Sequence, residues 1–436
     1  MDDRLSHHLA QLGSADPSRR LETLRRLMSL VRHGLLPAVP RTGACNNHVH
    51  STYSFSPYTP SQIAWKAYEA GLSVCGIVDH DTVAGVGEFV EACKIVGVVP
   101  TVGFELRVRF DGTPLEGLRF NNPDQTSVAY FPVHGVPLSA LEQITDLLQP
   151  VRAARLERNR KMTGQLDAML SPAGLGLDFE RDVIPVSQWE KGGTITERHL
   201  LFAAGQKLIA RCGRGPGLVT FLRESMNLPV SGAALAWLSD PENPYYDFDL
   251  TNLLKGHLSP RMYLPAEEAE LPGIRETIRT LTNLGCIPTY TYLGDVRGAS
   301  VTGDKRAQAF EDDILETLLQ TLHSYGLRAV SSAPTRNAPD QVARLEALSK
   351  KYELLEVLGE DINQPRQPFV NTNLRPEQQA RFHLAAWALA GHEAAVNADS
   401  DAGLFSAVAV AGTPELARRI SDYAAMGQKR WSELFR

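Results

Sequence analysis

The sequence predicts an α/β protein built on a parallel sheet or barrel. From about residue 41 onward, short apolar segments of strand length alternate with longer segments in which apolar residues recur every three or four positions. This alternation is typical of parallel strands, because a helix carries the chain back to the start of each new strand. Functional residues in such folds gather at the carboxyl ends of the strands, so polar side chains at those ends are the candidates for a site.

The composition is that of an ordinary soluble protein. The chain has 436 residues, enough for one large domain with additions or for two or three domains, and a formal net charge of -6. This weakly acidic charge gives no electrostatic reason to expect a nucleic acid or an anionic membrane as a partner. The polar N-terminus does not resemble a signal peptide, no apolar run has the length of a membrane span, and five cysteines lack C-x-x-C spacing. We therefore expect a cytoplasmic protein with reduced thiols.

The first forty residues predict a helical extension. Asp16 can cap a helix, Pro17 suits its first position and Gly34 suits its end. One apolar stripe runs along this helix, formed by Leu21, Leu24, Met28 and Val31. A single stripe of this kind indicates a helix that docks on the rest of the protein.

Strands and helices then follow one another along the chain. A short strand leads into the segment CNNHVHST, and the middle of the chain, about residues 111–260, is long and rich in turns. Beyond it the alternation resumes, and the last sixty-odd residues are helical, with helix starts at Pro376 and Pro414. The expected helices cover residues 60–70, 86–97, 140–170, 196–208, 274–285, 310–326 and 340–352, and the further strands 74–78, 98–108, 126–131, 286–293, 327–333 and 354–359.

Four polar residues fall at the predicted strand ends. His48 and His50 are one residue apart, and because side chains alternate along a strand, both imidazoles point to the same side. His80 and Glu105 follow the next two strands at the spacing of βα units. Imidazole and carboxylate ligands suit Zn, Mn or Fe, which indicates a metal site. The alternatives are loop histidines bonded to their neighbours and a glutamate in a structural salt bridge.

Three of these segments resemble a known family. HVHSTYS, IVDHDTVAG and GFE are similar to the first three motifs of the PHP domain, which is named for polymerase and histidinol phosphatase. RLERNRKM, ITERHL and GEDIN follow in the order of the later motifs, so the resemblance covers about residues 41–370. It implies a distorted (β/α)7 barrel with a long middle insertion over about residues 111–260. Residues 1–40 and 371–436 would then be N- and C-terminal helical extensions.

The resemblance also implies a ligand set. For a first metal it gives His48, His50, Glu105 and Asp361, and Glu105 would bridge to a second metal that His199 also binds. The other histidine of the second site is expected in a strand after Glu105, but the segment TSVAYF contains none. Either His134, a few residues later, replaces it or the second site lacks this ligand.

A third metal site is altered. His80 matches the family, but Phe55 or Ser56 stands where an acidic residue or histidine is expected, and Asn363 stands in place of the final histidine. The A-H-P motif of many members is replaced by TYTYLGD. The resemblance therefore implies one or two divalent ions, with Asn363 at the position of a lost ligand to the third.

The expected function is a metal-dependent hydrolase, most simply a phosphoesterase in which hydroxide formed on the metal attacks the substrate. Catalysis would involve His80, Glu105 and Asp361. Arg198 and Arg366 either bind a small anionic substrate or form intramolecular ion pairs. The alternatives are a binding or scaffold protein that has lost catalysis, and a metal-dependent hydrolase or lyase acting on a non-phosphate bond. The helical extensions could support a homo-oligomer.

Two pairs of aspartates lie in segments similar to the family motifs. Asp79 and Asp81 flank His80, where they would either orient its ring or cap the loop. Asp399 and Asp401, in NADSDAG, superficially resemble the closing family motif. They lie beyond the last expected strand, and we interpret this segment as a turn between helices.

Overall fold

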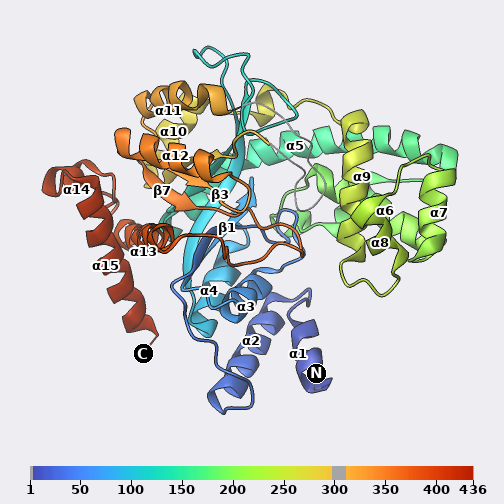
Figure 1. The fold of residues 1–436 in the computed structure, drawn as a ribbon, viewed down its shortest axis with the longest axis horizontal. Helices are drawn as coiled ribbons and strands as arrows, with labels where there is room; N and C mark the ends of the chain where they lie inside the picture. The colour runs from blue at the N-terminus through green and yellow to red at the C-terminus, as the bar shows by residue number, and fades with distance from the viewer. Residues whose placement is uncertain (1–2, 297–310, 436) are drawn as a thin grey trace.

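The computed structural model describes residues 3–296 and 311–435. A seven-stranded sheet with strand order β1-β2-β3-β4-β5-β6-β7 forms its centre (Figure 1). Each strand therefore lies beside its neighbours in the sequence. The strands are β1 (Cys45–Val49), β2 (Val74–His80), β3 (Val99–Arg109), β4 (Val128–His134), β5 (Ile287–Tyr292), β6 (Ala329–Ser332) and β7 (Leu355–Leu358).

The sheet nearly closes into a barrel. Val49, at the end of β1, forms a parallel bridge with Ile362, which follows β7. The amide of His50 donates to the carbonyl of Ile362 at 2.9 Å, and the amide of Ile362 donates to the carbonyl of His48 at 3.0 Å. These bonds join the first strand to the last at the carboxyl end, and the predicted α/β barrel is confirmed.

One strand runs against the expected direction. β4 pairs antiparallel with both β3 and β5, whereas the other neighbouring pairs are parallel. The reason is the connection between β3 and β4, which contains no helix that could carry the chain back across the sheet. β4 also extends past the predicted segment 126–131, so that His134 is its last residue.

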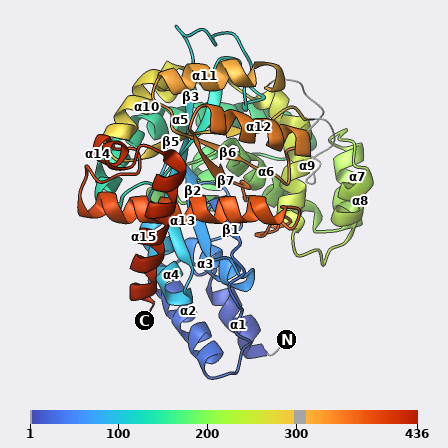
Figure 2. The same ribbon diagram turned by 60° about the vertical axis from the view of Figure 1, so that its left-hand side comes forward.

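Helices cover the outside of the barrel. α3 (Pro60–Glu69) and α4 (Val86–Val96) pack beside the first strands, and α10 (Ile274–Asn283), α11 (Leu315–Ser324) and α12 (Pro339–Lys351) lie beside the last ones (Figure 2). The start of α3 is fixed by a capping box, in which Thr59 and Gln62 each accept a backbone hydrogen bond from the other's residue.

The N-terminal extension contains two helices, α1 (Asp3–Gln11) and α2 (Pro17–Arg32). As predicted, Asp16 caps α2, accepting from the amide of Ser18 at 2.9 Å. α1 was not predicted, since its sequence is polar apart from a few leucines. α2 packs against α3 and α4 through buried residues that include Leu24 and Leu27, so the extension is an outer layer on that side of the barrel.

The middle region adds a helical body with its own core. Its helices are α5 (Leu141–Leu170), α6 (Glu197–Cys212), α7 (Pro216–Glu224), α8 (Gly232–Ser239) and α9 (Tyr246–Met262). Buried apolar side chains such as Leu166, Leu201 and Leu250 form this second core. In Figure 1 the body lies to one side of the barrel, with α5 leading out to it.

The C-terminal extension comprises α13 (Pro376–Ala398), α14 (Ala407–Gly412) and α15 (Leu416–Leu434). α13 packs on the first residues of several strands, among them Val74, Val99 and Ala329. It therefore covers the amino end of the barrel and leaves the carboxyl end available for a site. The segment of Asp399 and Asp401 is a turn between α13 and α14, as interpreted from the sequence.

All five cysteines are free thiols, and four of them are buried. Across residues 3–296 and 311–435, every helix is too short or too polar to cross a membrane.

Candidate metal centre

Three buried side chains converge at the carboxyl end of the barrel. One ligand atom from each of His48, His50 and Glu105 lies within 4.8 Å of the other two, the one such metal-binding group among the described residues. The Nε2 atoms of the two histidines are 3.1 Å apart. Two nitrogens that each bind a tetrahedral zinc ion at about 2 Å lie about 3.3 Å apart, so this donor pair fits a metal ion closely.

The strands position these ligands by an irregularity in β1. The pairing of β1 with β2 shifts register between Asn46 and Val49, as a β-bulge does. The carboxamide oxygen of Asn46 accepts from the amides of His48 and Glu360, which holds the bulge in place. Glu105 pairs with His80, the last residue of β2. It lies inside β3, which continues for four residues beyond it.

A hydrogen-bond chain orients His50. Its Nδ1 lies 3.2 Å from Oγ of Ser54, which in turn donates to Asp79 at 2.7 Å. The amide and hydroxyl of Ser51 donate to the same carboxylate at 2.7 and 2.6 Å. With Nδ1 carrying the proton toward Ser54, the lone pair of Nε2 faces the centre, as metal ligation requires.

Asp361 lies beside His50, on the backbone bridge that closes the barrel. Its Oδ1 is 3.1 Å from Nε2 of His50, and its side chain is 40 % exposed. The side-chain nitrogen Nδ2 of Asn363 donates to the same Oδ1 at 2.9 Å. Asn363 therefore holds this carboxylate in place, and its own nitrogen has no lone pair to offer to an ion.

His80 and Glu105 form a contact across neighbouring strands. Nδ1 of His80 lies 3.0 Å from Oε2 of Glu105, and the His80 ring centroid is 4.5 Å from that of His50. Burial raises the pKa of Glu105, but the hydrogen bond and charge of His80 and the charge of His48 outweigh it and lower that pKa. Glu105 is therefore an anionic donor at neutral pH.

The balance between burial and neighbouring charges sets a different pKa shift for each of the two ligand histidines. Burial lowers the pKa of His48 more than Glu105 raises it, so this ring is neutral. Burial also lowers the pKa of His50, but the hydrogen bond and charge of Asp361 outweigh burial and raise it. A bound cation would displace the proton that Asp361 favours on His50.

The aspartates next to His80 do not orient its ring. Asp79 accepts hydrogen bonds from Ser51 and Ser54, as described above. Asp81, which has a positive φ of 52°, turns its carboxylate to Arg155 at 2.6 Å. Neighbouring side chains on a strand face opposite sides, so Asp79 is directed away from the face that His80 occupies.

Arg155 belongs to a buried network of charges that sequence reasoning did not assign. Arg155 and Arg158 both contact Glu197, at 3.1 and 2.5 Å, and Arg158 also forms a two-pronged pair with Glu270. Arg107 of β3 contacts Glu270 as well. The only sign in the sequence was the segment RLERNRKM, now part of α5. The network joins the helical body to the barrel beside the centre.

His199 lies at the start of α6, outside the group of three. Its Nδ1 accepts a hydrogen bond from the amide of Thr196 at 3.0 Å. Burial and the nearby Arg155 lower the pKa of His199 to about 3. Its ring centroid is 5.1 Å from that of Phe55, which stands where the family has a polar ligand.

Phe55 is part of an aromatic cluster. Its ring centroid lies 5.9 Å from that of Phe202 on α6 and 5.6 Å from that of Phe248 on α9. The three phenylalanine rings therefore form an apolar cluster that contacts the His199 ring. The cluster is formed by the helical body, which a scan of local motifs does not reveal.

His134 lies in the barrel interior close to His48. The two ring centroids are 6.3 Å apart. Nε2 of His134 and Nδ1 of His48 are both buried and have no hydrogen-bond partner among the described residues. Burial and the neighbouring His48 lower the pKa of His134 to about 3, so the ring is neutral.

The two candidate substrate arginines have different surroundings. Arg366 forms a two-pronged pair with Asp249, at 2.8 Å for both bonds, and its guanidinium lies 4.0 Å above the ring of Trp237. This is the intramolecular alternative considered from the sequence. Arg198 donates to Asn252 at 3.1 Å, and its guanidinium lies 6.0 Å from the centre of the Phe55 ring.

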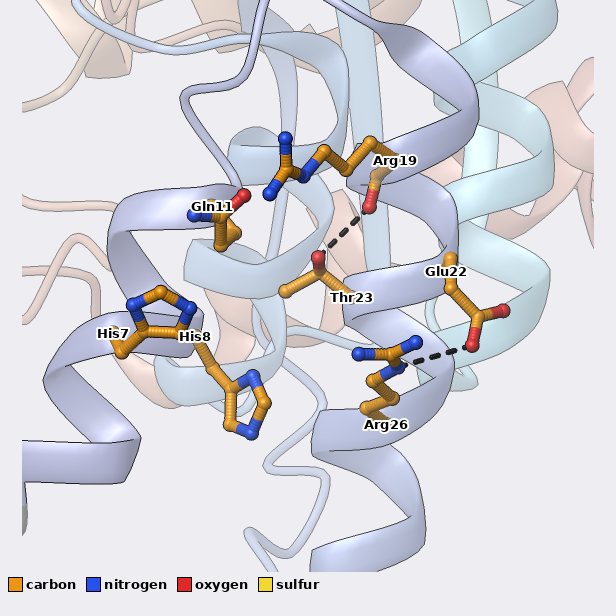
Figure 3. Close-up of a pocket in the computed structure, with 7 residues that line it drawn as sticks. All are labelled: His7, His8, Gln11, Arg19, Glu22, Thr23 and Arg26. Carbon is orange, nitrogen blue, oxygen red and sulfur yellow. Dashed lines mark hydrogen bonds and ion pairs between the residues drawn. The ribbon is translucent and has the colours of Figure 1, made fainter.

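A separate pocket lies between α1 and α2 (Figure 3). His7 and His8 line it from α1, and Arg26 faces them from α2 with an ion pair to Glu22 at 3.1 Å. This pocket is built from the N-terminal extension and contributes nothing to the barrel site.

Comparison with known proteins supports the resemblance stated above. Residues 46–171 match the family model of the PHP domain. A 5'-3' exoribonuclease of Haemophilus influenzae is 34% identical over 85 residues, which are 19% of this chain and 31% of that protein. An error-prone DNA polymerase of Cutibacterium acnes is 34% identical over 79 residues, 18% of this chain and 7% of that protein. The chain thus spans less than a third of either relative.

A solved structure matches more of the chain. A Bifidobacterium adolescentis protein, proposed to be a metal-dependent phosphoesterase, superposes with a TM-score of 0.51 at 20% identity. The match covers 80% of this chain and 97% of that one. At this identity the likeness concerns the fold. The PHP resemblance is confirmed for residues 46–171, and the barrel architecture for most of the chain.

Proposed function

We propose that this chain, in which residues 46–171 match the PHP domain, is a metal-dependent hydrolase with one divalent ion at its centre. The observation that carries the proposal is the convergence of His48, His50 and Glu105, three buried donors within 4.8 Å of one another. A cluster of buried imidazoles and a carboxylate is costly without a cation, which favours a metal site over a scaffold. Zn, Mn and Fe all suit this donor set.

A bound ion would supply Lewis acidity and lower the pKa of water to near neutrality. The chain's own residues would do the rest. His48 and His50 would bind through Nε2, with His50 oriented through Ser54. Glu105 would supply the anionic ligand. Its partner His80 is 20% exposed and could exchange a proton with the reacting water.

Asp361 has two roles open to it in this proposal. Its carboxylate is close enough to His50 to join the ligand set. It is also the most exposed acidic group at the centre, so it could instead take part in catalysis by exchanging a proton with the reacting water. Asn363, which donates to Asp361, would keep that carboxylate directed at the ion in either role.

A phosphoester is the substrate class that we propose. Arg198, which lies 6.0 Å from the Phe55 ring, is the cation that we propose to bind its negative charge. The weakly acidic chain gave no reason to expect nucleic acid, but two relatives are named as a ribonuclease and a DNA polymerase. Phosphodiesters of RNA and DNA therefore belong among the substrates to be tried beside small phosphomonoesters.

The first experiment is elemental analysis of protein purified without added metal. We expect about one equivalent of Zn, Mn or Fe in the wild type, and its loss in the double variant His48→Ala/His50→Ala. His33→Ala, at an exposed position on the N-terminal extension, is the matched control and should keep the metal. Phosphoester hydrolysis is then measured on all three proteins. Failure of the wild type to bind Mn, Fe or Zn even when supplied would refute the proposal and favour a scaffold.

A further inference from the structure

His199 is held by the first turn of α6 in a way that determines where its proton lies. It occupies the third helical position, and its Nδ1 accepts from the amide of Thr196, the N-cap residue, at 3.0 Å. A backbone amide is always a donor, so Nδ1 is the unprotonated nitrogen in this bond, and the Thr196 hydroxyl, 3.2 Å from Nδ1, can donate to the same atom. The neutral ring then carries its hydrogen on Nε2.

Deep burial keeps this ring neutral. His199 is 2% exposed, and burial together with the positive charge of Arg155 lowers its pKa to about 3. The neighbouring His80 also lowers the pKa of His199. At neutral pH His199 therefore presents an N–H group and no lone pair at Nε2.

A metal ligand needs the opposite arrangement. To bind an ion through Nε2, the ring would have to carry its proton on Nδ1, which would then face the amide hydrogen of Thr196. The bond from the Thr196 amide would be lost, and the Thr196 hydroxyl would have to accept the proton of Nδ1 at this buried position. Phe55, in contact with the same ring, offers no second ligand on that side.

On the basis of the proposed function, we infer that His199 is a neutral hydrogen-bond donor to an anionic oxygen of the substrate and is not a metal ligand. It lies at the start of α6, next to Arg198 on the same helical turn, and its ring contacts Phe55. The pair combines a neutral donor with a cation, a combination that suits the oxygens of a phosphate group.

The proton position is tested first, on metal-free protein. Selective ¹⁵N labelling of histidine and long-range ¹H–¹⁵N correlation distinguish the two neutral ring forms, and His199→Gln assigns the signals. We expect His199 to carry its proton on Nε2, with no change when Zn is added. A proton on Nδ1, or a shift of the proton to Nδ1 on adding Zn, would overturn the inference. This measurement does not depend on hydrolysis, so it can fail or succeed separately from the proposed function.

Metal binding is tested with a variant that keeps the cap. Glutamine is a usual residue at the third position of a capping box, so His199→Gln should still accept from Thr196 while removing the imidazole. We expect the same metal content as in the wild type and a Kd for Zn within about threefold, whereas His48→Ala should lose the metal. A loss of one equivalent, or a Kd raised about tenfold or more in His199→Gln, would make His199 a ligand.

The donor role is tested with inorganic phosphate as the probe. Calorimetric titration of Zn-loaded protein should show phosphate binding weakened about tenfold or more in His199→Leu, which lacks a donor, because a hydrogen bond to an anion is lost. His199→Gln, which retains an amide donor, should recover part of that affinity. Equal phosphate affinity in the wild type and both variants would rule out the donor role.

Discussion

Nη1 of Arg155 lies 2.6 Å from Oδ2 of Asp81, and both side chains are almost fully buried. Arg155 is on α5, the first helix of the helical body, and Asp81 directly follows β2. The pair therefore fastens the helical body to the carboxyl end of the barrel, one residue from His80. Burial lowers the pKa of Arg155, but Glu197 and Asp81 outweigh it and raise that pKa, so the arginine stays charged.

Breaking this pair should lower the free energy of unfolding substantially. Asp81→Asn leaves Arg155 without one of its buried counter-charges, and the loss of a buried partner typically costs about 3–5 kcal/mol of unfolding free energy. Asparagine tolerates the positive φ of 52° at this position, so backbone strain does not confuse the result. Chemical denaturation monitored by circular dichroism measures the change.

The control for this prediction is an exposed ion pair. Glu157→Gln weakens the contact between Glu157 and Arg160 on the same helix, where both side chains are largely exposed. This should cost less than about 1 kcal/mol. A similarly small cost for Asp81→Asn would show that the buried pair does not fasten the two parts together.

Asp79 should control metal affinity without touching the metal. It accepts hydrogen bonds from Ser51 and Ser54, and Ser54 contacts the outer nitrogen of His50. Asp79→Asn removes the anionic acceptor, so His50 should be held less firmly and the Kd for Zn should rise about 10–100-fold. Competition with a chromophoric chelator measures this Kd.

Ser54→Ala separates orientation from folding in the same site. This change removes the bridge to His50 but leaves Asp79 its two bonds from Ser51. The Kd for Zn should still rise, while the free energy of unfolding of the metal-free protein should change less than in Asp79→Asn. Unaltered Zn affinity in both variants would show that the chain of hydrogen bonds does not position His50.

The sequence located the candidate centre because its main ligands lie in short, local motifs. His48 and His50 are one residue apart at one strand end, and His80 and Glu105 pair with each other on neighbouring strands. Such placement follows from strand periodicity and from the alternation of strands and helices. The structure brings these four residues and Asp361 together.

Other features depend on contacts between distant segments and could not be predicted. The direction of β4 is set by the length and content of its connections, which a periodic pattern does not encode. The pairing of Arg366 with Asp249 and the aromatic cluster around Phe55 require the position of the helical body. Which nitrogen of His199 carries the proton depends on a contact with the backbone amide of Thr196, and the residue types alone do not indicate that contact.

His134 should act on the centre through His48. The outer nitrogen of His48, Nδ1, must carry a proton when Nε2 binds a metal, and a ligand histidine almost always donates that proton to a partner. Nε2 of His134, on the neighbouring ring, is buried without a partner among the described residues, and it can accept this proton when the His134 ring carries its own on Nδ1. His134→Phe, which keeps the ring volume, should therefore raise the Kd for Zn about tenfold.

The control for the His134→Phe prediction is a spectroscopic measurement of the Nδ1 proton of His48. In Zn-loaded wild type, His48 should show a protonated Nδ1 that is shielded from exchange with solvent, and His134→Phe should make that proton exchange faster. If Zn affinity and the exchange rate are both unchanged, His134 is only a packing residue in the barrel interior.

His392 should make the folded state sensitive to acid. It lies on α13 beneath the barrel, where its Nε2 contacts the carbonyls of Gly135 and Gly285 at 3.1 and 2.8 Å, and its Nδ1 accepts from the amide of Leu404 at 2.9 Å. The ring thus joins α13 to two loops at the amino end of the barrel and to the turn that follows α13. Burial lowers the pKa of His392 to about 4, although the two carbonyls oppose this.

The direction of the pH effect follows from the two pKa values. In the unfolded chain a histidine has a pKa of about 6.5, so between about pH 6.5 and 4 the unfolded state binds a proton that folded His392 does not. Stability is therefore retained above pH 6.5 and lost as the pH falls through this window. The slope is about 1.4 kcal/mol per pH unit and the total about 3 kcal/mol.

His392→Gln tests this directly, on metal-free protein so that the centre does not contribute. At pH 8 the variant should be less stable, because glutamine does not reproduce all three hydrogen bonds of His392. As the pH is lowered to 4.5, the wild type should lose stability faster, and the gap between the two proteins should close by about 2–3 kcal/mol. His134 and His199 titrate in both proteins and cancel in the difference. A gap that stays constant from pH 8 to 4.5 would show that His392 does not cause the acid sensitivity.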